Sequence, residues 1–473
     1  MAVTEPAPAA ATAAHEGILR RQAQRESAAR TYARSLPIVP VRARGMTIEG
    51  ADGRRYLDCL SGAGTLALGH NHPVVLEAIR KVIDSGAPLH VLDLATPVKD
   101  AFTTELFATL PPELADDARV QFCGPAGTDA VEAAFKLVRA ATGRDGLLAF
   151  TGAYHGMTAG ALAASGGATD VRVTRLPFPQ TYRCPFGTGG ERGAEIAARW
   201  TEHLLDDPKG GVPAPGAMIV EPVQGEGGVN PAPDSWLRRM RDITRDRSIA
   251  LIADEVQTGV GRTGAFWAVE HSGVVPDVMV LSKAIGGSLP LAVIVYRSGL
   301  DLWQPGAHAG TFRGNQLAMA AGSATLAYVR ENRLAERAGT LGARMIAQLQ
   351  ALAADHPSIG DVRGRGLMIG IELVDPEAAP ADVTAENGCA PPPDPALAAA
   401  VQRECLRRGL IVELGGRHSA VVRLLPPLTL TDEQATAVVD RLADALRAAE
   451  RSSHRRTAAG RPADPGSLTR KTP

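Results

Sequence analysis

The sequence predicts an α/β protein built on a large, doubly wound and mostly parallel sheet. Between about residues 120 and 300, short apolar runs alternate with stretches of helical periodicity. Buried strands joined by helical connectors are typical of a parallel sheet that carries helices on both faces. The chain of 473 residues, 45% hydrophobic and 21% charged, has the composition of an ordinary globular protein and can bury a large core.

Charge and composition exclude several classes of protein. Lys and Arg number 50 and Asp and Glu number 51, so the net charge of −1 predicts no binding to nucleic acid or to an anionic membrane. No apolar stretch of about 18 residues is present, and no signal peptide is recognisable at the N-terminus. The five cysteines are scattered, with no CxxC pair. We therefore expect reduced thiols, no metal site and a cytoplasmic location.

The strands of the large sheet are expected where the apolar runs lie. These runs are Val120–Phe122, Leu147–Phe150, Ala217–Val220, Ile249–Ala253, Val278–Leu281 and Ala292–Tyr296. Helices are expected between them at Val131–Ala141 and Trp236–Arg245, where the apolar period becomes helical. Upstream, a turn at residues 51–53 precedes a strand at Tyr56–Leu60, and residues 74–84 form a helix.

The C-terminal part predicts a smaller α+β domain. An Ala-rich helix with breaks covers residues 316–356, strands follow at Leu367–Leu373, Leu410–Glu413 and Val421–Leu424, and a last helix covers residues 432–449. We predict the following organisation: disordered tails at 1–14 and 451–473, a large domain at 66–325, a small domain at 326–450 with a surface loop at 375–397, and a segment at 15–65 that packs with the small domain.

Two charged residues follow buried strands of the predicted sheet. Asp254 ends the run Ile249–Ala253, and Lys283 follows the run Val278–Leu281. Ligands of doubly wound sheets bind beyond the carboxyl ends of strands, so both residues are candidates for chemistry. An isolated Asp there is more often a helix cap, and most lysines lie at the surface. A desolvated Lys, however, has a lowered pKa and can form a Schiff base.

Two further segments supply an anion site and an aromatic ring. Residues 124–130 (GPAGTDA) are small and polar and precede a helix, whose first N–H groups can bind an anion, although Asp129 could be a simple cap. Tyr154 follows the run Leu147–Phe150 and could stack on a planar ring or pack in the core. An anion cradle, an aromatic platform, an acid and a lysine together are what pyridoxal phosphate requires.

At this point the chain closely resembles the class III (omega) aminotransferases over about residues 25–450. The most specific stretch is LIADEVQTGVGRTG at 251–264, followed by LSKAIGG at 281–287. The resemblance implies the pyridoxal-phosphate-dependent transferase fold type I, the fold of aspartate aminotransferase. It makes Lys283 the Schiff-base lysine and Asp254 the partner of the pyridine nitrogen. The other implied cofactor-binding residues are Ala126, Gly127, Thr128, Tyr154, His155, Gln257 and Thr311.

The same resemblance implies how substrates bind. Thr311, in HAGTFRGN at 308–315, would reach the phosphate held by the other subunit, which implies a homodimer with shared active sites. Arg423 would clamp a substrate carboxylate, and Glu226, in EPVQGEGG at 221–228, would pair with Arg423 when an omega-amino donor binds. Both residues could instead belong to a weak surface ion pair.

Among class III enzymes, the chain is most similar to diaminobutyrate–2-oxoglutarate aminotransferases. Met157 stands where several relatives carry an Arg that binds a distal carboxylate, which argues against 4-aminobutyrate or acetylornithine as donor. The implied reaction exchanges the distal amino group between L-2,4-diaminobutyrate and 2-oxoglutarate. An omega-aminotransferase with another donor (ornithine, 4-aminobutyrate or another diamine), an aminomutase or racemase, and a catalytically silent protein of this fold remain alternatives.

Overall fold

The computed structural model describes residues 8–27, 29–167, 171–378 and 390–459. Its main element is a seven-stranded sheet with the order β4-β12-β11-β10-β7-β5-β6. The strands are β4 (Ala118–Phe122), β5 (Gly146–Phe150), β6 (Val173–Leu176), β7 (Pro215–Val220), β10 (Ala250–Asp254), β11 (Val278–Leu281) and β12 (Val293–Arg297). β12 runs antiparallel to both of its neighbours, and the remaining pairs are parallel. The predicted mostly parallel sheet is confirmed.

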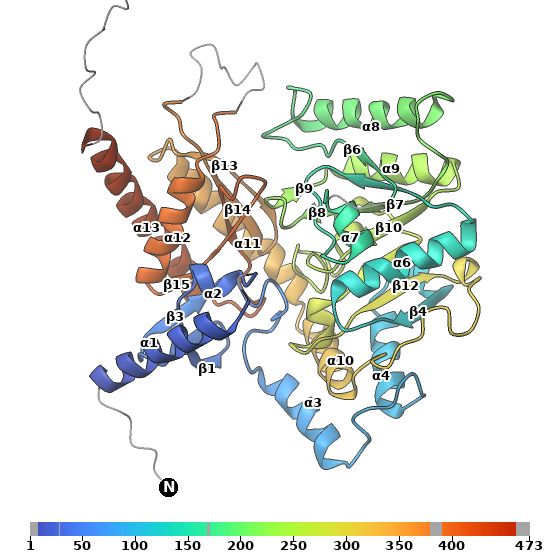
Figure 1. Cartoon of the computed structure of the whole chain (residues 1–473), viewed down its shortest axis with the longest axis horizontal. Helices are drawn as coiled ribbons and strands as arrows, with labels where there is room; N and C mark the ends of the chain where they lie inside the picture. Colours follow the sequence, from blue (N-terminus) through green and yellow to red (C-terminus); the bar gives the residue numbers. More distant parts are fainter. Residues whose placement is uncertain (1–7, 28, 168–170, 379–389, 460–473) are drawn as a thin grey trace, which may run out of the picture.

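Helices cover both faces of this sheet because successive side chains of a strand point to opposite faces (Figure 1). In β5, Leu147 and Ala149 join one core cluster with helix α6 (Gly127–Thr142). Leu148 and Phe150 join another with α8 (Gly190–Asp206) and α9 (Asp234–Asp246). The central strands are therefore apolar at every position, and the polar residues of the sheet appear where the strands end.

A further group of helices lies near one edge of the large sheet. They are α3 (Pro73–Asp84), α4 (Pro97–Phe107), α5 (Pro112–Ala115) and α10 (Gln316–Glu331), and α10 packs against α3 and α4. The short elements of this half are α7 (Ala159–Ala164), the hairpin β8 (Val223–Gln224) and β9 (Asn230–Pro231), and the 3-10 turns η1 (Ala268–Ser272), η2 (Lys283–Gly286) and η3 (Ser298–Leu300).

Two smaller sheets form the other half of the molecule (Figure 1). The first, β13-β14-β17-β16, is antiparallel and comprises β13 (Ile359–Arg365), β14 (Met368–Leu373), β17 (Val421–Leu424) and β16 (Glu413–Gly415). The second contains β1 (Pro40–Arg44), β2 (Thr47–Gly50), β3 (Arg55–Asp58) and β15 (Leu410–Ile411). Because β15 pairs with β3, the N-terminal strands are joined to the C-terminal part of the chain. The helices here are α1 (Pro8–Arg25), α2 (Tyr32–Ser35), α11 (Leu334–Ala353), α12 (Pro395–Arg407) and α13 (Asp432–Ala459).

The structure corrects several expected boundaries. The proposed domain boundary at 325/326 falls inside α10, and the helix breaks only at Asn332 and Arg333, where Arg333 is left-handed (φ 51°). Helix α1 begins at Pro8, so the tail expected at 1–14 is helical from there, because Ala-rich sequence favours helix and Pro is tolerated in a first turn. Helix α13 continues past 449 to Ala459, in place of a loose segment from 451.

Other differences lie in the C-terminal half. The strand expected at Leu410–Glu413 is split between β15 and β16, which belong to different sheets. Part of the expected loop 375–397 lies outside the described residues, and its end is the first turn of α12. Among the described helices, none has the length and apolar character needed to cross a bilayer.

Candidate active site

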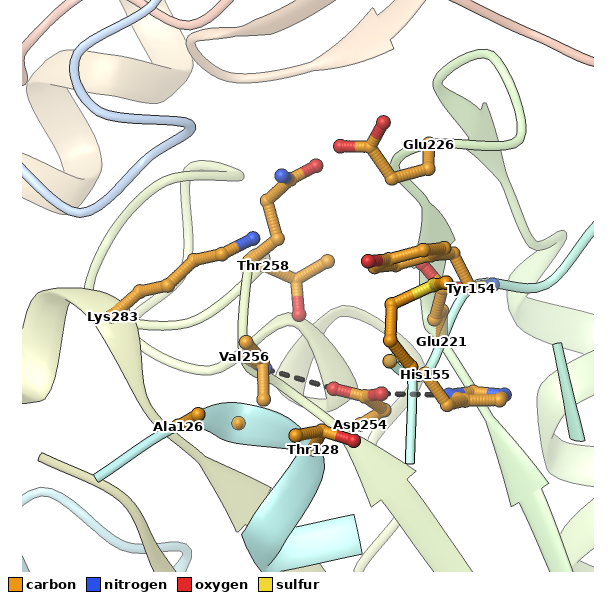
Figure 2. Close-up of a pocket in the computed structure, with 14 residues that line it drawn as sticks. Ala126, Thr128, Tyr154, His155, Glu221, Glu226, Asp254, Val256, Thr258 and Lys283 are labelled. Carbon is orange, nitrogen blue, oxygen red and sulfur yellow. Dashed lines mark hydrogen bonds and ion pairs between the residues drawn. The ribbon is translucent and has the colours of Figure 1, made fainter. Parts of the chain in front are cut away.

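A cavity of about 250 Å³ lies beyond the carboxyl ends of β10 and β11 (Figure 2). Figure 2 shows Lys283 and Tyr154 on opposite sides of it, with Asp254 at its base and Glu226 at its rim. The lining residues are Ala126, Gly127, Thr128, Tyr154, His155, Gly156, Met157, Glu221, Glu226, Asp254, Val256, Gln257, Thr258 and Lys283. The structure thus gathers in one cavity all the predicted site residues except Thr311 and Arg423.

Asp254 is the last residue of β10 and is held in place from two sides. Its Oδ1 accepts the Val256 N–H at 3.1 Å, and its Oδ2 contacts Nδ1 of His155 at 2.7 Å (Figure 2). Burial lowers the pKa of His155. The hydrogen bond and charge of Asp254, together with the charge of Glu221, raise this pKa by more than burial lowers it, so the net shift is upward. The contact with His155 holds the carboxylate of Asp254 in a fixed orientation.

Glu221, at the end of β7, is a buried carboxyl that we did not predict as a site residue. It accepts the N–H groups of Tyr154 at 2.8 Å and Gly225 at 3.0 Å, and so fixes both loops that border the cavity. Burial raises its pKa to about 7, with Asp254 adding to the rise and His155 opposing it. Its position directly after the buried strand β7, as with Asp254 after β10, is the signal that could have identified it.

Lys283 occupies an unusual backbone position directly after β11. Its φ of 49° lies in the left-handed region, where non-glycine residues are uncommon and often functional. The Ser282 hydroxyl donates to the Leu291 carbonyl at 2.8 Å. A Cβ on Gly287 (φ 55°) would lie 2.3 Å from the Ala321 carbonyl oxygen, so only glycine allows this close approach to α10. Burial lowers the pKa of Lys283, against the opposing charges of Glu226 and Asp254.

The N-terminus of α6 also borders the cavity. Ala126 precedes the helix, whose first N–H groups have no intrahelical acceptor and face the cavity with Gly127 and Thr128. The N-cap residue is Ala126 and not Asp129, which lies at the third position of the helix; the carboxylate of Asp129 accepts the Ala126 N–H at 3.2 Å. The Thr128 hydroxyl contacts that of Thr158 at 2.6 Å.

This cavity fits pyridoxal phosphate. Two of the lining residues each have a buried polar atom with no hydrogen-bond partner within the described structure, Oε1 of Gln257 and Nε2 of His155. A Cβ on Gly127 would lie 3.1 Å from Val256, so the backbone there lies close to the loop after Asp254. An anion cradle, a fixed carboxylate, an amine of lowered pKa and an unsatisfied amide are therefore present around one space of suitable size.

Arg423 lies behind Glu226 and does not line the cavity directly. It is completely buried on β17, and its Nη2 donates to Oε1 of Glu226 at 2.7 Å and to Oε2 of Glu413. A surface ion pair is therefore the wrong interpretation of Glu226 and Arg423. Tyr32 lies near Glu413, whose charge adds to the effect of burial in raising the pKa of Tyr32. Neither Glu413 nor Tyr32 was predicted, because sequence spacing does not reveal contacts between such distant segments.

Thr311 lies outside the cavity of its own chain. It is exposed, and its carbonyl oxygen contacts Nε2 of His90 at 3.1 Å. Within a single chain the structure therefore does not bring Thr311 to the predicted phosphate site.

Fold and site together define an enzyme of the fold type I transferase class. The family model for class III aminotransferases (Aminotransferase class-III) matches residues 28–446, and the chain belongs to this family. The predicted family and fold are confirmed.

Comparison with particular proteins gives a finer picture. The chain is 54% identical over 449 residues (93% of this chain and 94% of the relative) to a Rhizobium meliloti (strain 1021) protein named diaminobutyrate–2-oxoglutarate aminotransferase. It is 47% identical over 437 residues (91% and 94%) to a Haemophilus influenzae protein of the same name. Among solved structures, the amine transaminase from an uncultivated Pseudomonas species in its PLP-bound form is similar, with a TM-score of 0.78 and 30% identity over 89% of this chain and 97% of that one.

Proposed function

We propose that this class III aminotransferase transfers the distal amino group between L-2,4-diaminobutyrate and 2-oxoglutarate, giving L-aspartate 4-semialdehyde and L-glutamate. The observation that carries the chemistry is the placement of Lys283 and Asp254 on neighbouring strand ends around one cavity. The choice of donor is supported by relatives named for this reaction at 37–54% identity. It is also supported by Met157, which lines the cavity where an Arg would favour other donors.

Pyridoxal phosphate is the cofactor, and when bound it withdraws electrons from the carbon that carries the reacting nitrogen. The N-terminus of α6, with Ala126, Gly127 and Thr128, would hold its phosphate. Asp254 would keep the ring nitrogen protonated, and His155 would keep Asp254 in place. Gln257 would meet the ring hydroxyl, and Tyr154 would stack near the ring.

Lys283 has two functions in this proposal. Its Nζ would hold the cofactor in the resting enzyme, and as a free amine it could accept a proton from the substrate. Because burial lowers its pKa, a larger share of the freed amine is neutral near pH 7 and able to act as a base. The same Nζ would hold this proton and later give it back, so that one amine would serve both half-reactions.

The absorption spectrum of the purified protein tests this function. We expect a long-wavelength band from bound pyridoxal phosphate that disappears when L-2,4-diaminobutyrate is added without acceptor and returns when 2-oxoglutarate is added. Loss of the band with glutamate but not with diaminobutyrate would keep the aminotransferase class and reject this donor. An aminomutase or racemase would turn over without consuming 2-oxoglutarate.

We propose that Glu226 and Arg423 form a switch between the two substrates. When an omega-amino donor binds, Glu226 stays paired with Arg423 and screens the guanidinium. When glutamate binds, its own carboxylate replaces Glu226 as the partner of Arg423. The 2.7 Å contact supports the closed state, and Nε and Nη1 of Arg423 are buried without a hydrogen-bond partner among the described residues.

Replacing Glu226 with Ala is expected to separate the two half-reactions. It exposes Arg423, so the half-reaction with diaminobutyrate should slow about tenfold or more, while the half-reaction with glutamate is affected less. Single-turnover absorbance changes with each donor measure the two rates separately. Equal losses in both half-reactions would contradict the switch.

We further propose a homodimer in which Thr311 completes the phosphate site of the other subunit. Large apolar side chains are exposed beside it, namely Leu89, Leu92, Leu94 and Phe312, and the Phe312 ring contacts His90. A patch of this kind is typical of a protein interface. We also propose a cytoplasmic location, supported by the free thiols of the buried Cys59, Cys123 and Cys405.

The dimer is tested by light scattering during gel filtration. For a chain of 49.4 kDa, we expect a particle of twice that mass. Thr311→Ala should leave the mass unchanged and weaken cofactor binding several-fold, because one hydrogen bond to an anion is lost. A wild-type protein that elutes as a monomer would contradict the dimer. A Thr311→Ala variant that binds the cofactor as tightly as wild type would contradict the role of Thr311.

A further inference from the structure

Two carboxylates share one guanidinium beside the cavity. Arg423 on β17 lies directly opposite Glu413 on β16, and its Nη2 donates to Glu413 and to Glu226. Arg423 is completely buried, and Glu413 is 8% exposed. Arg423 and Glu413 are buried and Glu226 is partly exposed, so two carboxylates face one guanidinium at the edge of the cavity, and an additional cation would stabilise this group.

The surroundings of Glu413 show the same imbalance. Burial raises the pKa of Glu413; Arg423 opposes the rise and Glu226 adds to it. Tyr32 lies near Glu413, and burial together with that carboxylate raises the pKa of Tyr32, so the phenol adds no charge to the cluster. Among the described residues, Glu413 forms an ion pair with Arg423 alone, and it shares this cation with Glu226.

This cluster acts on the cavity. Glu226 lines the cavity and shares Arg423 with Glu413. Burial lowers the pKa of the Lys283 amine. The negative charge of Glu413, like those of Glu226 and Asp254, raises this pKa and so opposes the effect of burial. A cationic group on a substrate bound at Lys283 would thus be attracted to the same cluster.

We propose that Glu413 determines which amino donor the enzyme accepts. Its carboxylate supplies the excess negative charge that attracts the second ammonium group of a diamino acid, the group that does not react. A donor with the same chain but a single amino group gains nothing from this charge. The inference rests on the proposed function and names the residue that makes the donor a diamino acid.

The test compares two donors that differ only in this group, L-2,4-diaminobutyrate and 4-aminobutyrate. In Glu413→Gln, which keeps the shape and loses the charge, we expect kcat/KM for diaminobutyrate to fall about tenfold or more, since the attraction between the carboxylate and the non-reacting ammonium group is lost. The value for 4-aminobutyrate is expected to stay the same or to rise. Glu404→Gln on α12, where Glu404 pairs with Arg407 and Arg408, is the matched control and should change neither value.

Each outcome decides a different point. Equal losses for both donors, or no loss for either, would overturn the role of Glu413. A wild-type enzyme that does not react with diaminobutyrate would instead reject the proposed function. Retained absorbance of bound cofactor and an unchanged melting temperature show that the variant is folded. If the Gln variant does not fold, Glu413→Asp, which withdraws the charge by one methylene, should lower the preference for diaminobutyrate several-fold, and an unchanged preference would overturn the proposal.

Discussion

Replacing Lys283 with Ala is expected to reduce turnover by about 10⁴-fold or more, the largest effect of any substitution in this protein. The variant loses both the covalent attachment of the cofactor and the base that moves the proton. Among the described residues that line the cavity there is no other amine, so none of these side chains can replace it. The phosphate cradle, Asp254 and Gln257 are unaffected, and the variant should still bind pyridoxal phosphate noncovalently.

The measurement has two parts. Steady-state assays give the loss of turnover, and the absorbance spectrum with cyanoborohydride reduction shows whether the cofactor becomes covalently attached. Wild type should retain the cofactor after reduction and denaturation, whereas Lys283→Ala should release it. Covalent retention in the variant would place the attachment on another residue and overturn the assignment of Lys283.

Replacing Asp254 with Asn is expected to produce the second-largest effect. The amide keeps the size of the side chain but cannot hold a proton on the ring nitrogen, so turnover should fall about 10²- to 10³-fold. The contact with His155 loses its charge, and the pKa of His155 should then fall, because Asp254 is the main group that raises it against the effect of burial.

Single-turnover kinetics and NMR titration of His155 check this prediction. A slow proton-transfer step with normal cofactor binding is the expected combination, together with a His155 pKa shifted downward. Turnover within about twofold of wild type would show that the ring nitrogen does not depend on Asp254. His155→Gln serves as the comparison, because it removes the support for Asp254 and keeps the carboxylate; its loss should be smaller.

The sequence was sufficient for every strand of the large sheet except β6, and for Asp254 and Lys283 at the ends of two of them. Runs such as Val278–Leu281 are apolar throughout because both faces are buried, so they stand out from the surrounding sequence, and Lys283 and Asp254 follow from their position after such runs. β13 was missed because its pattern mixes Gly, Asp and Arg with apolar residues. β15 was not separated from β16, since only pairing with β3 divides that segment.

The polar contacts behind the cavity could not be predicted in the same way. Glu413 lies in a short strand whose neighbours are fixed by tertiary pairing with Arg423, and Tyr32 lies in a four-residue helix near the other end of the chain. Local periodicity contains no information about such contacts. Glu221 was recognisable by the rule that identified Asp254, but its burial and its two backbone N–H partners became evident only in the structure.

The contact between Tyr32 and Glu413 and the pairing of β3 with β15 also bear on how the chain folds. Both join segments that lie far apart in the sequence. Contacts between such distant segments close a very long loop and slow folding. Strand β3 therefore keeps an unpaired edge until the segment that forms β15 has been synthesised. Such an edge favours aggregation, and the nascent protein is an expected client of chaperones that shield unpaired strands.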